Sequence, residues 1–339
     1  MPASFPPPDD YFEARMVRAS RLVSPSVTPP ILQRVGDEAV SYAGARAPER
    51  TRTVDSSGAA ITVHEWGDAS APCLYCIHGG FDFARTFDVF APLLADAGWR
   101  VVSWDQRGHG DSAYAELYSF EADLRDATAV MDATTDRPGV VVAHSKGGSM
   151  AIQLADAQPF RFSHMVNLDG IPYRRPVPDV AEHERTRMLA SDVAGWLDHR
   201  RRTVAAQRRP GTLDELAERR AQMNPRLSHD WLRYLVSVGA RHDPDGWRWK
   251  IDPTMRMGGF GPWRPEWTIM RLPGLAMPFL SLLGTEPDVM SWGTLPHHVK
   301  RFLPTGGRCE VVEGVGHFVH IERPVEVAAT VLEFVGRPR

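Results

Sequence analysis

Short apolar runs alternate with segments long enough to form a helix, and this alternation restricts the fold more than any other feature of the sequence. The runs are rich in Val, Ile, Leu or aromatic residues and lie at 60–66, 73–77, 100–104, 140–143, 164–168, 278–283 and 309–312. Runs this short, bounded by turn residues, are typical of buried strands. Strands that alternate with helices predict a mostly parallel sheet of the α/β class, with helices on both faces.

The alternation stops between Gly170 and about Gly261, where the sequence predicts three or four helices followed by a stretch rich in tryptophan. A block of helices that interrupts a strand–helix series is typical of an inserted subdomain. The first 50 residues are rich in proline and are interpreted as an extension that packs on the surface or stays loose. We therefore predict an N-terminal extension (1–50), a first part of the core (51–170), a helical cap (171–258) and a second part of the core (259–339).

Composition argues against several classes of function. The chain has 339 residues, and its 39 basic and 42 acidic side chains give a formal net charge of −3. No long-range field would then attract nucleic acid or an anionic membrane. Three cysteines do not form a disulfide framework, and no apolar run reaches the roughly 18 residues of a membrane helix. We expect a cytoplasmic protein without a nucleic-acid or membrane partner, and leave its oligomeric state open, with a homodimer as one alternative.

The segment 140–148 carries the strongest indication of chemistry. A buried strand leads through Ala143, Ser145 and Gly147 into residues 149–156, which have a helical pattern. Small residues two before and two after a serine suit a sharp strand-to-helix turn, which presents the hydroxyl at the carboxyl edge of the sheet. Such a turn also places the backbone N–H of Lys146 at a helix N-terminus, where it can stabilise an oxyanion.

Here the sequence resembles the α/β-hydrolase family, whose nucleophile motif is Gly-x-Ser-x-Gly, with Ala143 in place of the first glycine. Three further segments match the family at strand ends and in the expected order: His-Gly-Gly at 78–80, Asp-Gln-Arg-Gly-His-Gly-Asp-Ser at 105–112 and Gly-Val-Gly-His at 314–317. The resemblance covers about 52–335, apart from the insert, which the family calls a cap or lid. It implies the α/β-hydrolase fold with an eight-stranded sheet. It also implies Ser145 as the nucleophile, which excludes the aspartate nucleophile of relatives that open epoxides.

A serine hydroxyl is a poor nucleophile near neutral pH and needs a base that a third group orients. The resemblance implies His317 as this base, and His144 and His320 are the nearby alternatives. It also implies Gly80 as a second oxyanion donor, because the family commonly uses the N–H of the residue after His-Gly. For a loop shifted by one residue the donor is Phe81, and the alternative role of Gly80 is to permit a tight turn.

The acid that orients the base stays open among three residues. Family members usually carry it in the loop after the seventh strand, often three residues past a glycine, but the residue three past Gly284 is a proline. Asp288 lies one residue further along and is the first choice, and Glu286 lies one residue nearer. Asp169, directly after the predicted strand at 164–168, which corresponds to the sixth strand of the family, occupies an alternative acid position known in the same fold.

The resemblance implies a serine hydrolase that cleaves an ester, lactone or thioester of a hydrophobic small molecule, with no metal or organic cofactor. The alternatives are hydrolysis of a carbon–carbon bond in a diketone-like substrate, acyl transfer, and a ligand receptor without enzymatic activity. Phe81, Trp196, Trp231 and Trp249 are candidate substrate contacts, although tryptophans between helices and a sheet commonly form core. The Lys146 side chain is interpreted either as a contact for a substrate carboxylate or as the partner of an acid.

Overall fold

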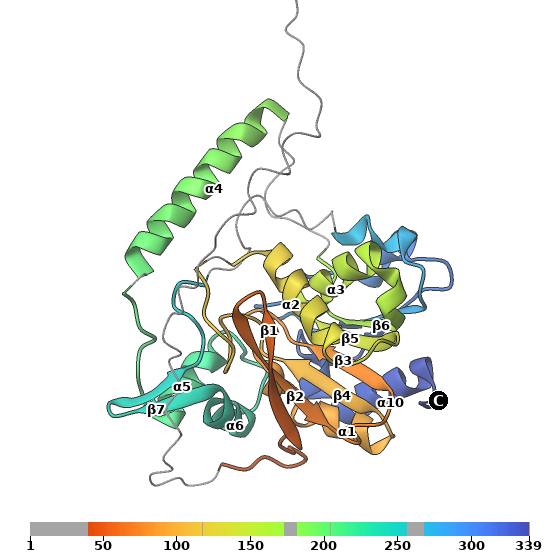
Figure 1. Ribbon diagram of the computed structural model, residues 1–339, viewed down its shortest axis with the longest axis horizontal. Coiled ribbons are helices and arrows are strands. Elements are labelled where there is room, and N and C mark those ends of the chain that lie inside the picture. The colour runs from red at the N-terminus through yellow and green to blue at the C-terminus, as the bar shows by residue number, and fades with distance from the viewer. Residues whose placement is uncertain (1–39, 117, 173–181, 204, 256–267, 339) are drawn as a thin grey trace, which may run out of the picture. The chain divides into compact units, whose positions relative to one another are not determined.

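The protein has a sheet of eight strands in the order β1-β2-β4-β3-β5-β6-β9-β10 (Figure 1). The structure is a computed structural model that describes residues 40–116, 118–172, 182–203, 205–255 and 268–338. β2 pairs antiparallel with β1 and β4, and the other pairings are parallel. The strands are β1 (Arg50–Ser56), β2 (Ala59–Trp66), β3 (Cys73–Ile77), β4 (Arg100–Trp104), β5 (Gly139–His144), β6 (Phe162–Leu168), β9 (Phe279–Gly284) and β10 (Arg308–Val312). The predicted α/β-hydrolase fold, with its mostly parallel eight-stranded sheet, is confirmed.

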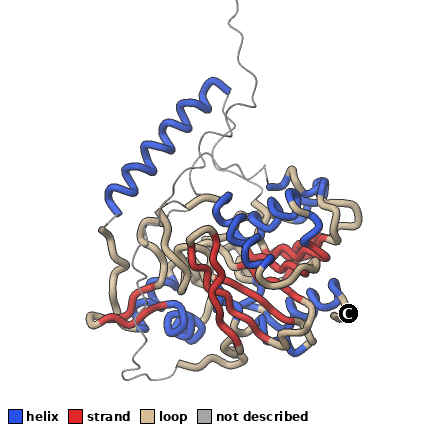
Figure 2. Tube along the Cα trace, viewed as in Figure 1, coloured by secondary structure: helices blue, strands red, loops and turns tan. Residues whose placement is uncertain are grey.

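Helices cover both faces of the sheet (Figures 1 and 2). α2 (Phe120–Asp132) and α3 (Lys146–Ala157) lie on one face, and α1 (Phe90–Asp96) and α10 (Pro324–Val335) lie on the other. Shorter pieces are α8 (Pro296–Val299), α9 (Val319–Glu322) and 3₁₀ turns at Ala84–Phe87, Pro159–Arg161, Leu272–Gly274 and Lys300–Phe302. Cys73 and Cys76 belong to the apolar clusters on opposite faces, and all three cysteines are free.

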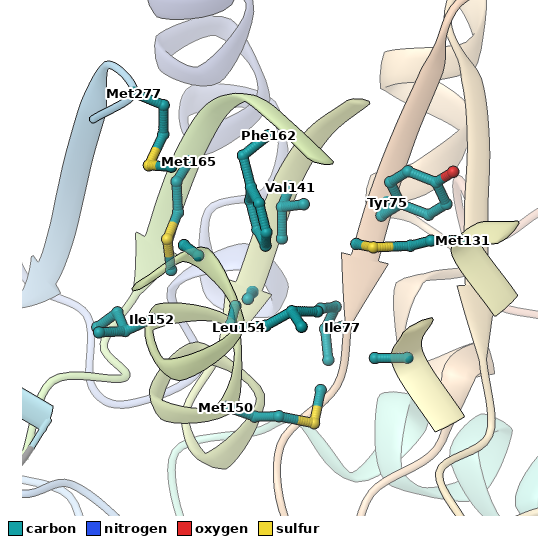
Figure 3. Close-up of a cluster of buried hydrophobic side chains, with 14 of the residues drawn as sticks. Tyr75, Ile77, Met131, Val141, Met150, Ile152, Leu154, Phe162, Met165 and Met277 are labelled. Carbon is teal, nitrogen blue, oxygen red and sulfur yellow. The ribbon is translucent and has the colours of Figure 1, made fainter. Parts of the chain in front are cut away.

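The helix that follows β5 is anchored by its apolar side chains. Met150 and Leu154 of α3 are buried in the same cluster as Ile77 of β3 and Val141 of β5 (Figure 3). Burying one side chain of this size contributes roughly 1.5–3 kcal/mol. The start of α3, and the turn that leads into it, are therefore held firmly against the sheet.

All seven predicted apolar runs form strands, and their ends differ from the prediction by at most two residues. The eighth strand, β1, does not appear as an apolar run because this edge strand is mostly polar and its residues alternate between exposed and more buried positions. Residues 1–39 of the predicted N-terminal extension lie outside the described residues.

Between β6 and β9 the alternation of strands and helices stops, as predicted. The described elements there are α4 (Glu182–Thr203), α5 (Leu213–Ala221), α6 (His229–Gly239) and an antiparallel hairpin of β7 (Ala240–Asp243) and β8 (Gly246–Trp249). α4 is a single helix of 22 residues, and the hairpin lies partly in the predicted tryptophan-rich stretch. Apolar residues of α5 and α6 form a third cluster with Phe83 and Phe318. None of the described helices is both long and apolar enough to span a membrane.

Candidate active site

Ser145 lies in a strained turn between β5 and α3. Its φ and ψ are 52° and −123°, a conformation that non-glycine residues rarely adopt. Its N–H donates to the carbonyl oxygen of Leu168 in β6 at 3.1 Å, which ties the turn to the neighbouring strand. Lys146 is the first residue of α3, so its N–H has no partner within the helix. Ala143 is fully buried in the core, so its methyl group is accommodated where the family motif has glycine.

Two glycines let other backbone segments approach this turn. A Cβ on Gly147 would lie 2.6 Å from the carbonyl oxygen of His78, and a Cβ on Gly170 would lie 2.6 Å from that of Ser145. Both neighbours are backbone atoms, so a larger residue at either glycine would shift the turn. The small residues around Ser145 therefore reflect close contact between the ends of β3, β5 and β6.

His317 follows β10 and lies against the end of β6. Its Nδ1 donates to Oδ2 of Asp169 at 2.6 Å, and the two side chains are only 1% and 4% exposed. The hydroxyl of Ser291 donates to the same oxygen at 3.3 Å. A histidine held in this way carries its proton on Nδ1 and offers Nε2 as a base. Ser145 and His317 line one pocket, so a hydroxyl, a base and an orienting acid are brought together.

The structure contradicts Asp288 as the partner of the His317 ring. Its Oδ2 accepts from the backbone N–H of His317 at 3.3 Å, and its Oδ1 accepts from that of Met290 at 3.0 Å. The side chain of Glu286 is exposed. The loop after β9 thus directs Asp288 to backbone groups, and the carboxylate that meets the ring is the alternative after β6, Asp169.

Backbone strain is concentrated in these elements. Four described residues other than glycine have a positive φ, and three of them are Phe81 (58°), Ser145 (52°) and Asp169 (44°). The fourth, Ser57, lies in the turn between β1 and β2. Such conformations cost of order 1–3 kcal/mol each and tend to cluster at functional sites.

Two histidines connect the loop at 78–81 to the turn at 105–112. The backbone N–H of Gln106 donates to Nε2 of His78 at 3.0 Å, and its side-chain amide donates to the His78 carbonyl oxygen at 2.6 Å. Nε2 of His109 accepts a backbone N–H of the loop at 3.1 Å. Burial lowers the pKa of His78 to about 4 and holds the pKa of His109 well below its usual range. Both rings therefore stay neutral and can accept these bonds.

The N–H that His109 accepts belongs to Phe81. Because this group is already engaged, Phe81 does not fit the role of oxyanion donor. Gly80 lines the pocket next to Ser145, in agreement with the position expected for the donor.

The side chain of Lys146 pairs with an acid, one of the two alternatives that the sequence leaves open. Its Nζ donates to Oε1 of Gln106 at 2.7 Å and lies 2.5 Å from Oδ2 of Asp123 in α2. Burial raises the pKa of Asp123, and the charge of Lys146 offsets part of this effect. The ammonium group thus binds to side chains of the core.

Two further histidines pack beside His317. Nε2 of His144 donates to the carbonyl oxygen of His317 at 3.0 Å, and the two ring centroids are 4.6 Å apart. The His320 ring lies 4.6 Å from that of His144 and 5.0 Å from that of Phe87. Burial holds the pKa of His144 well below its usual range and lowers that of His320 to about 3. Both are neutral rings, and neither meets a carboxylate as His317 does.

One pocket contains both Ser145 and His317. Its apolar lining comes from Phe81, Met223, Met290 and Phe318, and its polar lining from Asp82, His144, Arg220 and Asn224, with Gly79 and Gly80 completing it. Among the described residues, no group of three or more His, Cys, Asp or Glu side chains is arranged to hold a metal ion.

The three tryptophans expected to contact substrate are not among the residues that line this pocket. Trp231 is fully buried on α6, and Trp249 of β8 packs against the same apolar cluster. Trp196 lies on α4. Of the four candidate contacts, Phe81 lines the pocket.

Asp82, Arg220 and Asn224 line the pocket but are not singled out by the sequence. The sequence could have indicated Asp82, because it lies two residues after the His-Gly-Gly segment at 78–80. Nothing in the charged sequence of α5 distinguishes Arg220 from its neighbour Arg219. Their role in the pocket depends on how the insert packs.

The chain is similar in sequence to known hydrolases. A model of the alpha/beta hydrolase family matches residues 74–330. The chain is 26% identical over 276 residues to the sn-1-specific diacylglycerol lipase ABHD11 of Mus musculus. This match covers 79% of this chain and 82% of that protein. It is 28% identical over 320 residues to epoxide hydrolase A of Mycobacterium tuberculosis, and this match covers 84% of this chain and 96% of that protein.

Among solved structures, the thioesterase domain from the curacin biosynthetic pathway has a TM-score of 0.71 to this protein at 22% identity. The match covers 84% of this chain and 99% of that domain. At this level of identity the likeness concerns the fold.

Proposed function

The chain belongs to the alpha/beta hydrolase family and is a hydrolase, and from this premise we propose that it cleaves an ester, lactone or thioester of a hydrophobic small molecule through an acyl-enzyme at Ser145. One observation carries the proposal: Ser145 occupies a strained turn at the N-terminus of α3, in the same pocket as the ring that Asp169 binds. Nucleophilic catalysis by serine requires a hydroxyl, a base and a group that orients the base.

In the proposed reaction, Nε2 of His317 takes the proton of Ser145 while Oγ attacks the substrate carbonyl carbon. Asp169 accepts the Nδ1–H bond and stabilises the imidazolium that forms. His317 then gives its proton to the leaving alcohol or thiol. A water molecule, deprotonated by the same ring, attacks the acyl-enzyme, and the proton returns to Oγ as the acid leaves.

The backbone N–H groups of Lys146 and Gly80 are the proposed donors to the oxyanion. Lys146 supplies the first N–H of a 12-residue helix, where the helix dipole favours negative charge. Gly80 lies in a loop that His78 and His109 hold in place. Loss of one such donor typically lowers kcat by about 10²- to 10³-fold.

The lining of the pocket supports a partly apolar substrate, because methionine and phenylalanine side chains form part of it. Met223 belongs to the segment between β6 and β9, and it lines the pocket together with Phe318 from the core. We infer that residues 171–258 act as a cap that shapes substrate preference and supplies neither the nucleophile nor the base.

Labelling with a fluorophosphonate tests the nucleophile. We expect one adduct per chain, and mass spectrometry of the digested protein should place it on Ser145, because the neighbouring base activates this hydroxyl alone. Ser145→Ala should abolish both the adduct and the hydrolysis of short-chain esters.

Ser149→Ala is the matched control, because Ser149 lies one helical turn further along α3, where its buried hydroxyl donates to the carbonyl oxygen of Gly170 at 3.0 Å. This variant should be labelled like the wild type. An adduct on another residue, or labelling that survives in Ser145→Ala, would refute the proposed nucleophile.

A further inference from the structure

A charged pair that the proposed mechanism does not use lies in the pocket beside Ser145. Arg220 comes from α5 and Asp82 from the loop after β3, and both line the pocket. Their side chains are only 12% and 2% exposed. The nearest atoms, Nη2 of Arg220 and Oδ1 of Asp82, are 3.8 Å apart, which is too far for a hydrogen bond. The two groups therefore form a buried ion pair that no hydrogen bond joins.

The contacts of Arg220 leave hydrogen-bonding capacity of its guanidinium unused. Nη1 donates to the carbonyl oxygen of Phe81 at 2.8 Å, and Cζ lies 5.9 Å from the centre of the Trp249 ring system. Nε is buried and has no hydrogen-bond partner among the described residues. Nε and Nη2 form the edge with which arginine binds a carboxylate through two parallel bonds. A guanidinium that is fixed in place, and whose Nε lacks a hydrogen-bond partner, is suited to binding an anion.

Asp82 does not occupy that edge. Both of its oxygens are buried without a well-formed hydrogen bond to a described residue. Burial raises the pKa of Asp82, and the charge of Arg220 and contacts with Thr86 and Phe83 offset part of this effect. In its protonated form Asp82 leaves the charge of the guanidinium uncompensated and can donate its own O–H to a ligand.

We propose that Arg220 binds a carboxylate of the substrate, so that the pocket selects esters or thioesters with an anionic group a few bonds from the scissile carbonyl. This inference rests on the proposed function and narrows its substrate class. The short spacing follows from the bond between Arg220 and Phe81, because Phe81 directly follows Gly80, the proposed oxyanion donor. Half-esters of short dicarboxylic acids have this spacing, and Met223 and Met290 leave apolar surface for the alcohol.

A cationic substrate is the competing alternative. Oδ1 of Asn224 and both oxygens of Asp82 are buried acceptors without a partner among the described residues, and an ionised Asp82 would attract an ammonium group. The guanidinium in the same pocket would repel that group. The charge of the preferred substrate therefore decides between the two.

Three ethyl esters of similar length test the proposal. They are ethyl hydrogen succinate, which is anionic, ethyl succinamate, which is neutral, and ethyl 4-(trimethylammonio)butanoate, which is cationic. We expect kcat/KM for the anionic ester to exceed that for the neutral ester by about tenfold or more, the effect of a hydrogen bond to a charged group. The cationic ester should be the poorest substrate.

Variants of Arg220 separate recognition from packing. In Arg220→Gln the ratio of kcat/KM between the anionic and neutral esters should fall to about one, and Arg220→Lys should retain part of it because a positive charge remains. Arg219→Gln is the matched control, since Arg219 is its neighbour on α5 and bonds to the carbonyl oxygens of Arg209, Pro210 and Glu215. The control should keep the wild-type ratio. A purely structural arginine would lower all three rates equally.

Calorimetry on Ser145→Ala gives a second measurement that does not depend on turnover. We expect this variant to bind ethyl hydrogen succinate more tightly than ethyl succinamate, and the addition of Arg220→Gln to remove the difference. Equal binding or equal turnover of the two esters would overturn the inference, and so would a preference for the cationic ester. If Ser145 is labelled but charge has no effect, only this inference fails, whereas absence of labelling refutes the proposed function itself.

Discussion

Asp169→Asn is expected to lower kcat for ester hydrolysis by about 10³- to 10⁴-fold, the loss typical of replacing the orienting acid of a serine triad by its amide. The carboxylate accepts the Nδ1–H of His317 at 2.6 Å. An amide that offers N–H groups at this position favours the tautomer with the proton on Nε2, and that ring cannot accept the proton of Ser145. Asparagine tolerates the positive φ of 44°, so the backbone should be retained. Steady-state kinetics measure the effect, and thermal unfolding checks that the variant is folded.

Asp288→Asn is the matched control for this change. Asp288 accepts two backbone N–H groups, and the amide oxygen of asparagine can keep one of them. We therefore expect a loss in kcat of less than about tenfold, together with a small decrease in stability. The opposite ranking of the two variants would show that the triad acid acts from the loop after β9.

Most of the fold could be predicted because strands buried on both faces appear as continuous apolar runs. β3 and β5 are fully buried along their length, and their predicted ends are correct to within one residue. β1 could not be found in this way, because it lies at the edge of the sheet and carries polar residues on its exposed side. The hairpin of β7 and β8 was not predicted either, because its aromatic residues are equally typical of packed loops.

The sharp turn at Ser145 could be predicted because its geometry is local. Small residues at positions 143 and 147 are needed wherever a strand turns sharply into a helix, and they surround Ser145 in the sequence. The partner of His317 is a different case, because it lies 148 residues away in the chain. Both Asp169 and Asp288 follow strands at the same edge of the sheet, so the sequence places both near the ring. Only the path of the loop after β9 decides which carboxylate reaches it.

The residues that line the pocket were the part of the site that the sequence predicted least well. The sequence singles out tryptophans of the insert as candidate substrate contacts, but Trp231 of α6 is buried in the apolar cluster. Arg220 occupies the pocket because α5 packs beside the loop that follows β3. The composition of the pocket lining therefore depends on the packing of the insert, which local sequence patterns do not encode.

Buried histidines should make the protein sensitive to acid, and His320 is a clear case among them. Its ring packs between His144, Phe87 and Phe90, and neither nitrogen has a hydrogen-bond partner among the described residues. Burial, with a smaller effect of His317, lowers its pKa from 6.5 to about 3. Between these two pH values the unfolded chain binds a proton that the folded protein does not. The free energy of unfolding therefore falls as the pH falls below about 6.5.

His320→Leu should remove this contribution, and comparison with the wild type isolates it. Between pH 7.5 and 4.5 the wild type should lose about 3 kcal/mol more unfolding free energy than the variant, since two pH units below 6.5 each count about 1.4 kcal/mol. The comparison is needed because burial raises the pKa values of the carboxyls of Asp82, Asp88 and Asp123. In both proteins these groups increase the free energy of unfolding as the pH falls, which opposes the effect of His320. Urea denaturation at the two pH values measures the difference. Equal losses in the two proteins would mean that the folded state protonates His320 as readily as the unfolded chain does.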